Sequence, residues 1–235
     1  MRPTTRDTPS TRLLRVLDAA ADAARSLSVR ELAARAELPR STTQRLAAEL
    51  VAWGGLERTP DGLRPGIRLF ELGQRVPRQR ALREVALPAM RDLHAATGRL
   101  IQLAILDRGE TVCVDQVVPR AEPRVPSRPG SRMPAHATAM GKVLLATTGA
   151  PPPDDLPAIT PHTITDPTTL VAELEAIRAR GYATNHEESQ RGLHGVAVAV
   201  GPEAGIAVSV RDEAELAPAL TALQAIAPAV RRALG

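Results

Sequence analysis

Apolar and polar residues alternate with a helical period in the first third of the chain. Residues 11–23 carry their leucines on one stripe, which predicts an amphipathic helix. A second helix is predicted to begin after Ser28, because Ser28 and Glu31 form a capping-box pattern. After an interruption at residues 37–39, a third helix is predicted over 40–53, stopped by the glycine pair that follows.

The stretch LERTPDGLRPG, residues 56–66, changes to the pattern of two short strands around a Pro-Asp-Gly turn. Two helices, a three-residue break, a third helix and a hairpin are typical of a winged helix-turn-helix. The hairpin follows the third helix and carries an arginine on each arm, as expected of the wing in such a domain.

Further along, residues 66–80 predict a short amphipathic linker helix ended by Pro77, and 81–98 a longer helix. Residues 99–118 and 196–210 alternate in the manner of strands, so each predicts an antiparallel hairpin. The remaining predicted elements are a short strand near Arg124 and Val125, a helix that starts within 136–146, a helix over 170–181 and a closing helix over 215–234.

This order predicts an α+β fold. Hairpins interleaved with helices favour a largely antiparallel sheet flanked by helices over a doubly wound parallel sheet. The expected domains are a winged helix-turn-helix over 1–65, a linker helix over 66–80 and an α/β domain over 81–235.

Charge is distributed unevenly over these domains. Residues 1–80 hold 15 Arg against 9 acidic residues, whereas residues 81–235 hold 15 Arg and Lys against 17 acidic residues. A basic excess confined to the first third indicates a nucleic-acid-binding module joined to a part that need not touch nucleic acid. The alternative is a solvated basic surface.

Composition indicates the cellular compartment and excludes several kinds of site. Cys113 is the only cysteine, so the chain has no internal disulfide framework and no cysteine metal site, and a reducing cytoplasm is expected. No apolar run reaches the roughly 18 residues of a membrane span, and the first residues lack a signal-peptide core. One Phe, one Tyr and one Trp are too few for a base-stacking platform.

The outward face of the third predicted helix has the chemistry to read a major groove. Arginine and glutamine can make bidentate contacts to guanine and adenine edges, and hydroxyl groups in a first helical turn can reach phosphate oxygens. The wing arginines are expected to contact phosphates. The expected DNA-contacting residues are Arg40, Ser41, Thr42, Gln44, Arg45, Arg58 and Arg64. The alternative is a three-helix module that binds protein.

An enzyme, either a hydrolase or a metal-dependent one, is the alternative for the C-terminal part. HEESQRGLH is not the HExxH pattern, so His186 and His194 could share a metal only if a strand and a turn fold them together. Ser189 and Ser209 lack the glycine-flanked elbow of a nucleophile. HATAMGK is not a phosphate loop, because His136 stands where that loop needs glycine. We therefore expect no catalytic residue, no metal and no cofactor.

Three motifs together resemble one known family, the IclR-type bacterial transcriptional regulators. They are LSVRELAARAELPRSTTQRLAAEL, RMPAHATAMGKVLLA and RARGYATNHEESQRGLHGVAVAV, in the family's order and spacing. The resemblance implies an N-terminal winged helix that dimerises and binds a palindromic operator, a linker helix, and a GAF-like C-terminal domain that binds a small effector. The implied assembly is a homodimer that acts as a repressor of transcription, with a tetramer made of two such dimers as the alternative.

The resemblance also implies the effector-binding residues. They correspond to Ala139, Met140, Asn185, Leu193, Gly195, Ser209 and Arg211. Asn185 stands where relatives have an acid and Arg211 where they have a serine, so the pocket is expected to be more basic and to take an anionic, carboxylate-containing effector. Alternatively, Arg211 pairs with a nearby surface acid. Lys142 is expected to pack and hydrogen-bond rather than to catalyse.

Overall fold

The structure, a computed structural model, describes residues 7–119 and 127–235. The strand expected near Arg124 and Val125 lies outside the described residues. The chain forms two compact units, the first ending at Pro77 and the second beginning at Arg78. No helix in the described ranges is long and apolar enough to cross a membrane.

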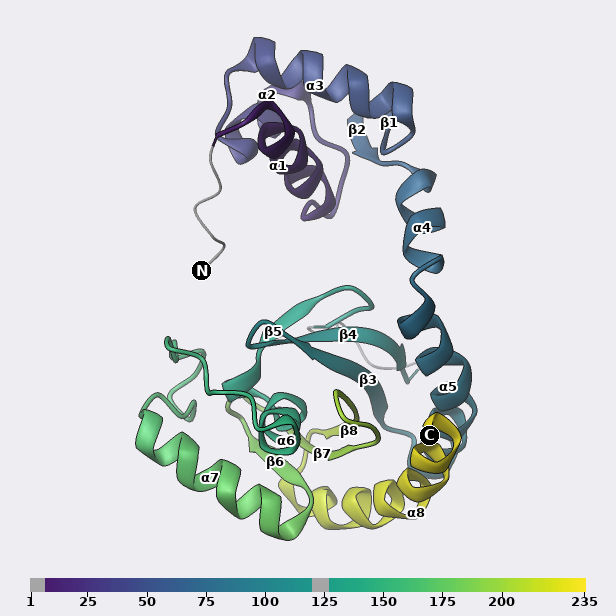
Figure 1. Ribbon diagram of the computed structural model, residues 1–235, viewed down its shortest axis with the longest axis vertical. Coiled ribbons are helices and arrows are strands. Elements are labelled where there is room, and N and C mark those ends of the chain that lie inside the picture. Colours follow the sequence, from purple (N-terminus) through teal and green to yellow (C-terminus); the bar gives the residue numbers. More distant parts are fainter. Residues whose placement is uncertain (1–6, 120–126) are drawn as a thin grey trace. The chain divides into compact units, whose positions relative to one another are not determined.

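The first unit is a three-helix bundle with a hairpin (Figure 1). Its elements are α1 (Pro9–Ala21), α2 (Val29–Ala36), α3 (Arg40–Trp53), β1 (Leu56–Thr59), β2 (Gly62–Pro65) and α4 (Ile67–Gln74). Val16, Leu32, Leu46 and Leu63 meet in one apolar core, so the three helices and the hairpin bury a common face.

Local signals explain where these helices begin and end. The Ser28 side chain accepts from the Glu31 amide and the Glu31 carboxylate accepts from the Ser28 amide, which completes the predicted capping box. Hydrogen bonds from Arg25 and Ser28 hold the pKa of Glu31 down at about 2. Gly54 ends α3 with a φ of 85°, a left-handed conformation that glycine adopts without a Cβ clash.

The second unit contains a six-stranded sheet with helices on both faces. Its elements are α5 (Pro77–Thr97), β3 (Leu100–Asp107), β4 (Glu110–Val117), β5 (Arg132–Pro134), η1 (Ala135–Ala137), α6 (Ala139–Thr148), α7 (Pro167–Arg180), β6 (Ala183–His186), β7 (His194–Ala199), β8 (Ala204–Val210), η2 (Glu213–Glu215) and α8 (Leu216–Leu234).

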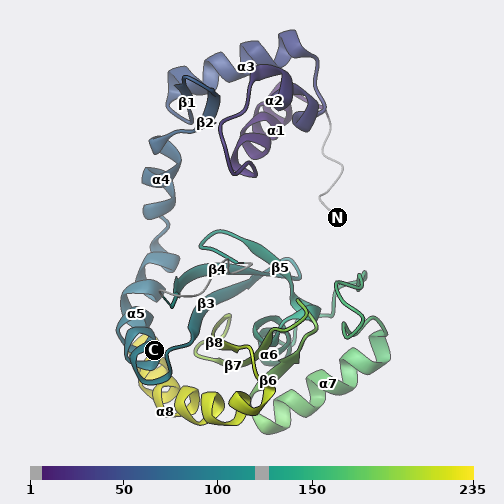
Figure 2. The same cartoon turned by 180° about the vertical axis from the view of Figure 1, so that it is seen from behind.

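The strand order is β5-β4-β3-β8-β7-β6, and every neighbouring pair is antiparallel. One apolar core joins α5 and α8 to one face of the sheet, and a second core joins α6 and α7 to the other face. The sheet curves around α6 in both views (Figures 1 and 2). The predicted α+β class, with its winged helix-turn-helix and antiparallel sheet, is confirmed.

Pro77 was expected to end the linker helix, and this was wrong. The linker helix α4 ends at Gln74, and Pro77 opens the long helix α5, four residues before the expected start. Proline is favoured at the first position of a helix because its missing N–H would have no intrahelical partner there.

Candidate functional site

The outward face of α3 presents most of the residues expected to contact DNA. The side chains of Arg40, Ser41, Gln44 and Arg45 are exposed, and Thr42 is half-buried. The opposite face is buried in the core of the first unit. The helix therefore offers a polar, basic surface on a packed support.

The start of α3 is suited to an anion. Its N-cap residue is Pro39, which makes no side-chain capping bond. The first amide groups of a helix have no partner inside it and lie at the positive end of its dipole. The amides near Ser41 and Thr42 are thus placed to meet a phosphate group.

Arg45 is engaged within its own helix. Its Nη1 atom donates to Glu49 Oε1 at 2.8 Å, one helical turn further along. Both side chains remain more than half exposed, so the pair is weak and easily exchanged for another partner.

The two wing arginines do not share a face. Arg58 lies opposite Leu63 and Glu57 lies opposite Arg64 in the register of the hairpin. Cross-strand partners share a face and successive pairs alternate, so Arg58 and Arg64 point to opposite sides. Arg64 also donates to Glu57.

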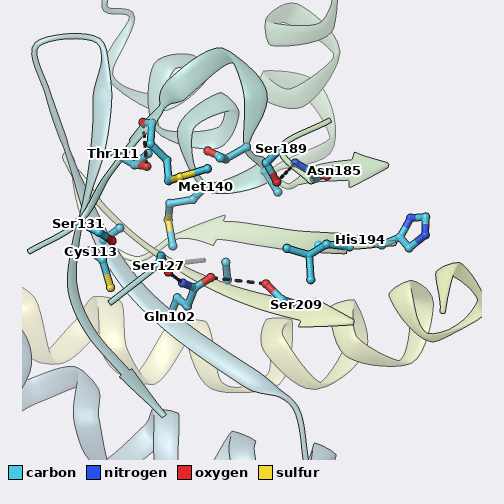
Figure 3. Close-up of a pocket in the computed structure, with 17 residues that line it drawn as sticks. Gln102, Thr111, Cys113, Ser127, Ser131, Met140, Asn185, Ser189, His194 and Ser209 are labelled. Carbon is cyan, nitrogen blue, oxygen red and sulfur yellow. Dashed lines mark hydrogen bonds between the residues drawn. The ribbon is translucent and has the colours of Figure 1, made fainter. Parts of the chain in front are cut away.

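The second unit contains a pocket between α6 and the sheet, with about 660 Å³ of empty space, part of it open to solvent (Figure 3). Six of the residues implied by the resemblance line it: Ala139, Met140, Asn185, Leu193, Gly195 and Ser209. The remaining described lining is Gln102, Ala104, Thr111, Cys113, Ser127, Ser131, Met133, Thr138, Ser189, His194 and Ala207.

Arg211, the seventh residue, lies outside this lining. Strand β8 ends at Val210, so the alternation that directs Ser209 into the pocket does not continue to Arg211. The Arg211 side chain is exposed, and its Nη1 atom lies 3.3 Å from the carbonyl oxygen of Gly192.

Neutral groups supply the polar chemistry of the pocket. None of its described lining residues is Asp, Glu, Lys or Arg. Gln102 connects two hydroxyl groups: it donates to Ser127 and accepts from Ser209 at 3.5 Å (Figure 3). Asn185 donates to the Ala137 carbonyl at 2.8 Å, and its Nδ2 lies 3.3 Å from the Ser189 hydroxyl.

The N-terminus of α6 faces this pocket. Thr138 is the N-cap, and its side chain accepts from the Gly141 amide at 2.9 Å. Ala139 and Met140 form the first helical positions, whose amides have no partner inside the helix. Gly141 permits the close fit, because a Cβ there would lie 2.2 Å from the backbone oxygen of Ala135.

Lys142 and His136 have structural contacts. Lys142 is buried, and its Nζ atom lies 2.6 and 2.8 Å from the two carboxylate oxygens of Glu188. His136 is buried, and its Nε2 atom lies 3.1 Å from the carbonyl oxygen of Pro157. Lys142 therefore packs and hydrogen-bonds, as its motif predicted.

Two family models match the chain over most of its length. "IclR helix-turn-helix domain" matches residues 11–60, and "Bacterial transcriptional regulator IclR C-terminal" matches residues 74–230. The chain belongs to the IclR family of bacterial transcriptional regulators. The IclR resemblance found in the sequence is thereby confirmed, and the chain is a DNA-binding regulator rather than an enzyme.

Two relatives of this chain are also named as transcriptional regulators. The HTH-type transcriptional regulator XynR of Escherichia coli (strain K12) is 32% identical over 197 residues, 80% of this chain and 78% of the relative. The transcriptional repressor IclR of the same strain is 30% identical over 200 residues, 81% of this chain and 73% of the relative.

A solved structure of an IclR homologue from Microbacterium hydrocarbonoxydans, complexed with 4-hydroxybenzoate, matches with a TM-score of 0.87 and 28% identity over 97% of this chain and 99% of that one. The IclR structure of Thermotoga maritima matches with a TM-score of 0.76 and 28% identity, over 96% and 98% of the two chains. The IclR fold thus accounts for both units.

Sequence reasoning missed most of the polar lining of this IclR pocket. Gln102, Thr111 and Cys113 come from the β3–β4 hairpin, far in sequence from the motifs that carry the resemblance. One signal was available: Gln102 is a polar residue in the centre of the apolar strand LIQLAIL. A buried polar side chain of this kind marks a place where a partner is needed.

Cys113 offers a test of whether the pocket is enclosed. Burial, and then the nearby Asp115 charge, raise the pKa of its thiol to about 11. Because only the thiolate reacts, we expect alkylation by iodoacetamide at pH 8 to be roughly 100-fold slower than for an exposed cysteine. Mass spectrometry over time measures the rate without ambiguity, since the chain has one cysteine.

The same reaction in urea-unfolded protein is the control and should be fast. A ligand in the pocket should slow labelling of the folded protein further. Labelling of the folded protein at the unfolded rate would show that Cys113 is open to solvent.

Proposed function

We propose that the chain is a homodimeric repressor whose operator affinity changes when a small carboxylate binds in the second unit. The observation that carries the effector part is the pocket itself, in which the N-terminus of α6 faces neutral hydroxyl and amide groups. Because the proposed target is bacterial DNA, we propose a cytoplasmic location.

The DNA part rests on the polar face of α3. Gln44 and Arg45 are the proposed base contacts, and Ser41 and Thr42, beside the uncapped helix start, are proposed to meet phosphate. Arg40 and one of the two wing arginines complete the proposed basic surface, since Arg58 and Arg64 point to opposite sides of the hairpin. Two such helices in a dimer read half-sites about one helical turn or a multiple apart, which makes a palindromic operator the natural target.

The dimer part is supported by apolar side chains exposed on the first unit. Ile67 and Phe70 on α4 are 66% and 62% exposed, and Leu14 on α1 is 57% exposed. Ile67 and Phe70 are three residues apart on α4 and so share one side of that helix, and an exposed apolar helix face of this kind is typical of protein–protein contacts. A second copy covering them would also set the spacing of the two recognition helices.

The effector part has a specific geometry. The amides of Ala139 and Met140 are proposed to bind the carboxylate, since a helix N-terminus favours a negative charge. Ser209 and Gln102 are proposed to hold a polar group at the other side of the ligand. The relative crystallised with 4-hydroxybenzoate makes an aromatic carboxylate the first probe to try. Bound effector alters repression only if it favours one arrangement of the dimer over another.

Gel retardation and calorimetry test both parts. The wild-type protein should retard the DNA upstream of its own gene, and a carboxylate panel that includes 4-hydroxybenzoate should contain a ligand that changes this retardation. Gly195→Leu should weaken that ligand at least tenfold, because Gly195 lines the pocket and a Cβ there would already contact Val208, Asn185 and Ala139, so the rest of a leucine side chain would take up ligand space.

Arg211→Ala is the matched control. Its side chain lies outside the lining, so this variant should bind the ligand like the wild type and retard DNA equally well. Equal binding by wild type and Gly195→Leu would reject the pocket as the effector site. A much weaker Arg211→Ala would instead assign the carboxylate to the arginine.

A further inference from the structure

Two histidines and a carboxylate meet at the start of β7. His186, the last residue of β6, lies directly opposite His194, the first residue of β7, in the antiparallel register. Cross-strand partners share one face of a sheet, with Cβ atoms about 5 Å apart. Glu213 opens η2, three residues after Val210, the partner of His194 on β8. One donor atom from each of the three lies within 4.8 Å of the others.

We propose that His186, His194 and Glu213 bind one zinc ion per chain. Two imidazole nitrogens and a carboxylate oxygen, with water in the fourth position, are a donor set typical of zinc. Calcium and magnesium prefer oxygen donors alone, so this set discriminates against them.

The His186 ring is already oriented for such a site. Its Nδ1 atom lies 2.8 Å from Glu213 Oε1, on the side of the cluster, while its Nε2 atom lies 3.1 Å from the Thr184 hydroxyl. Metal-binding histidines usually have their second nitrogen held by an outer partner of this kind. Thr184 is therefore a positioning residue for His186.

The His194 ring is not committed to a competing contact. Its Nδ1 atom is buried and has no hydrogen-bond partner within the described ranges. The two rings are in edge contact, with centroids 6.1 Å apart. A bound ion would draw the donor atoms to about 3.5 Å from one another. Side-chain rotation suffices for this, since His186 and Glu213 are 49% and 65% exposed.

The proposed ion lies on the opposite face of the sheet from the pocket. His194 belongs to the pocket lining, as do Leu193 and Gly195 on either side of it, but its ring points away from the pocket (Figure 3). Zinc would join β6, β7 and the segment after β8 without occupying the effector site. Its binding is thus independent of the proposed function.

The test is a zinc titration of chelator-stripped, full-length protein against a competing fluorescent chelator. The wild type should bind one ion per chain. His186→Ala, His194→Gln and Glu213→Gln should each weaken that binding by at least 10- to 100-fold, and Thr184→Val by about tenfold.

His162→Gln is the matched control. His162 also faces a carboxylate, with its Nε2 atom 3.3 Å from Glu187, and is 56% exposed, but it belongs to no three-residue cluster among the described residues. This variant should bind zinc like the wild type. Absence of a one-to-one site in the wild type, or equal losses in His162→Gln and the cluster variants, would overturn the proposal.

Far-UV circular dichroism checks that each variant is folded, and Glu213→Gln, at an exposed position, serves as the variant least able to disturb folding. DNA retardation by the zinc-free protein separates this proposal from the repressor function. A protein that retards DNA and binds no zinc would overturn only the metal site.

Discussion

Replacing Lys142 by methionine is expected to destabilise the second unit by about 3–5 kcal/mol. Lys142 and Glu188 form a pair whose side chains are only 3% and 7% exposed. Removing the ammonium group leaves a carboxylate that is buried and has lost its counter-charge. Glu173, 3.9 Å from Lys142, loses a weaker interaction at the same time.

Urea unfolding followed by far-UV circular dichroism measures the loss. Trp53, the only tryptophan, lies in the first unit, so its fluorescence provides an internal reference whose midpoint should not move. The double variant Lys142→Met, Glu188→Leu should recover much of the stability, because replacing both members of a buried pair by apolar residues is often nearly neutral. A loss below about 1 kcal/mol in the single variant would contradict this account.

The ion pair also determines part of the pocket. Glu188 follows Asn185 by three residues, and its backbone N–H donates to Asn185 Oδ1 at 3.1 Å. The carbonyl of Glu188 accepts from the Thr163 hydroxyl at 2.7 Å. The segment that presents Asn185 and Ser189 to the pocket is therefore held through Glu188, and weaker effector binding should accompany the stability loss.

The fold could be predicted largely because its signals are local. The capping box at Ser28, the glycine at the end of α3 and the alternation in the two long hairpins each lie within a few residues of the structure that they produce. Strand β5 has three residues and β6 has four, too few to show a period, and neither has the Pro-Asp-Gly turn that revealed the equally short β1 and β2, so neither was predicted. Pro77 was misjudged because proline both ends and opens helices.

The site residues were harder to predict from the sequence, since they meet only through tertiary structure. Lys142 could be expected to hydrogen-bond, but its partner Glu188 is 46 residues away. His186 and His194 required a turn to bring them together, and the register of β6 with β7 does so. Arg211 was implied only by the family resemblance, and it lies outside the pocket lining because β8 ends one residue earlier.

Replacing Arg45 by alanine is expected to weaken operator binding by about 1–3 kcal/mol, roughly 5- to 150-fold, if the guanidinium contacts a base. Retardation of a panel of operators with single base changes measures both the loss and its specificity. If Arg45 contacts a base, Arg45→Ala should lose its preference for the base pair at one operator position. Uniform weakening across the panel would mean that Arg45 contacts phosphate only.

Two further variants, Glu49→Ala and Arg45→Lys, test whether Arg45 contacts a base or a phosphate. Arg45 pairs with Glu49 at 2.8 Å in the free protein, so DNA must replace that contact, and Glu49→Ala should bind the operator as well as the wild type or better. Lysine keeps the charge of Arg45 and loses its planar fork, so Arg45→Lys should behave like Arg45→Ala at a base and like the wild type at a phosphate. Loss of binding in Glu49→Ala would mean that the ion pair, rather than a free arginine, holds α3 in its DNA-binding form.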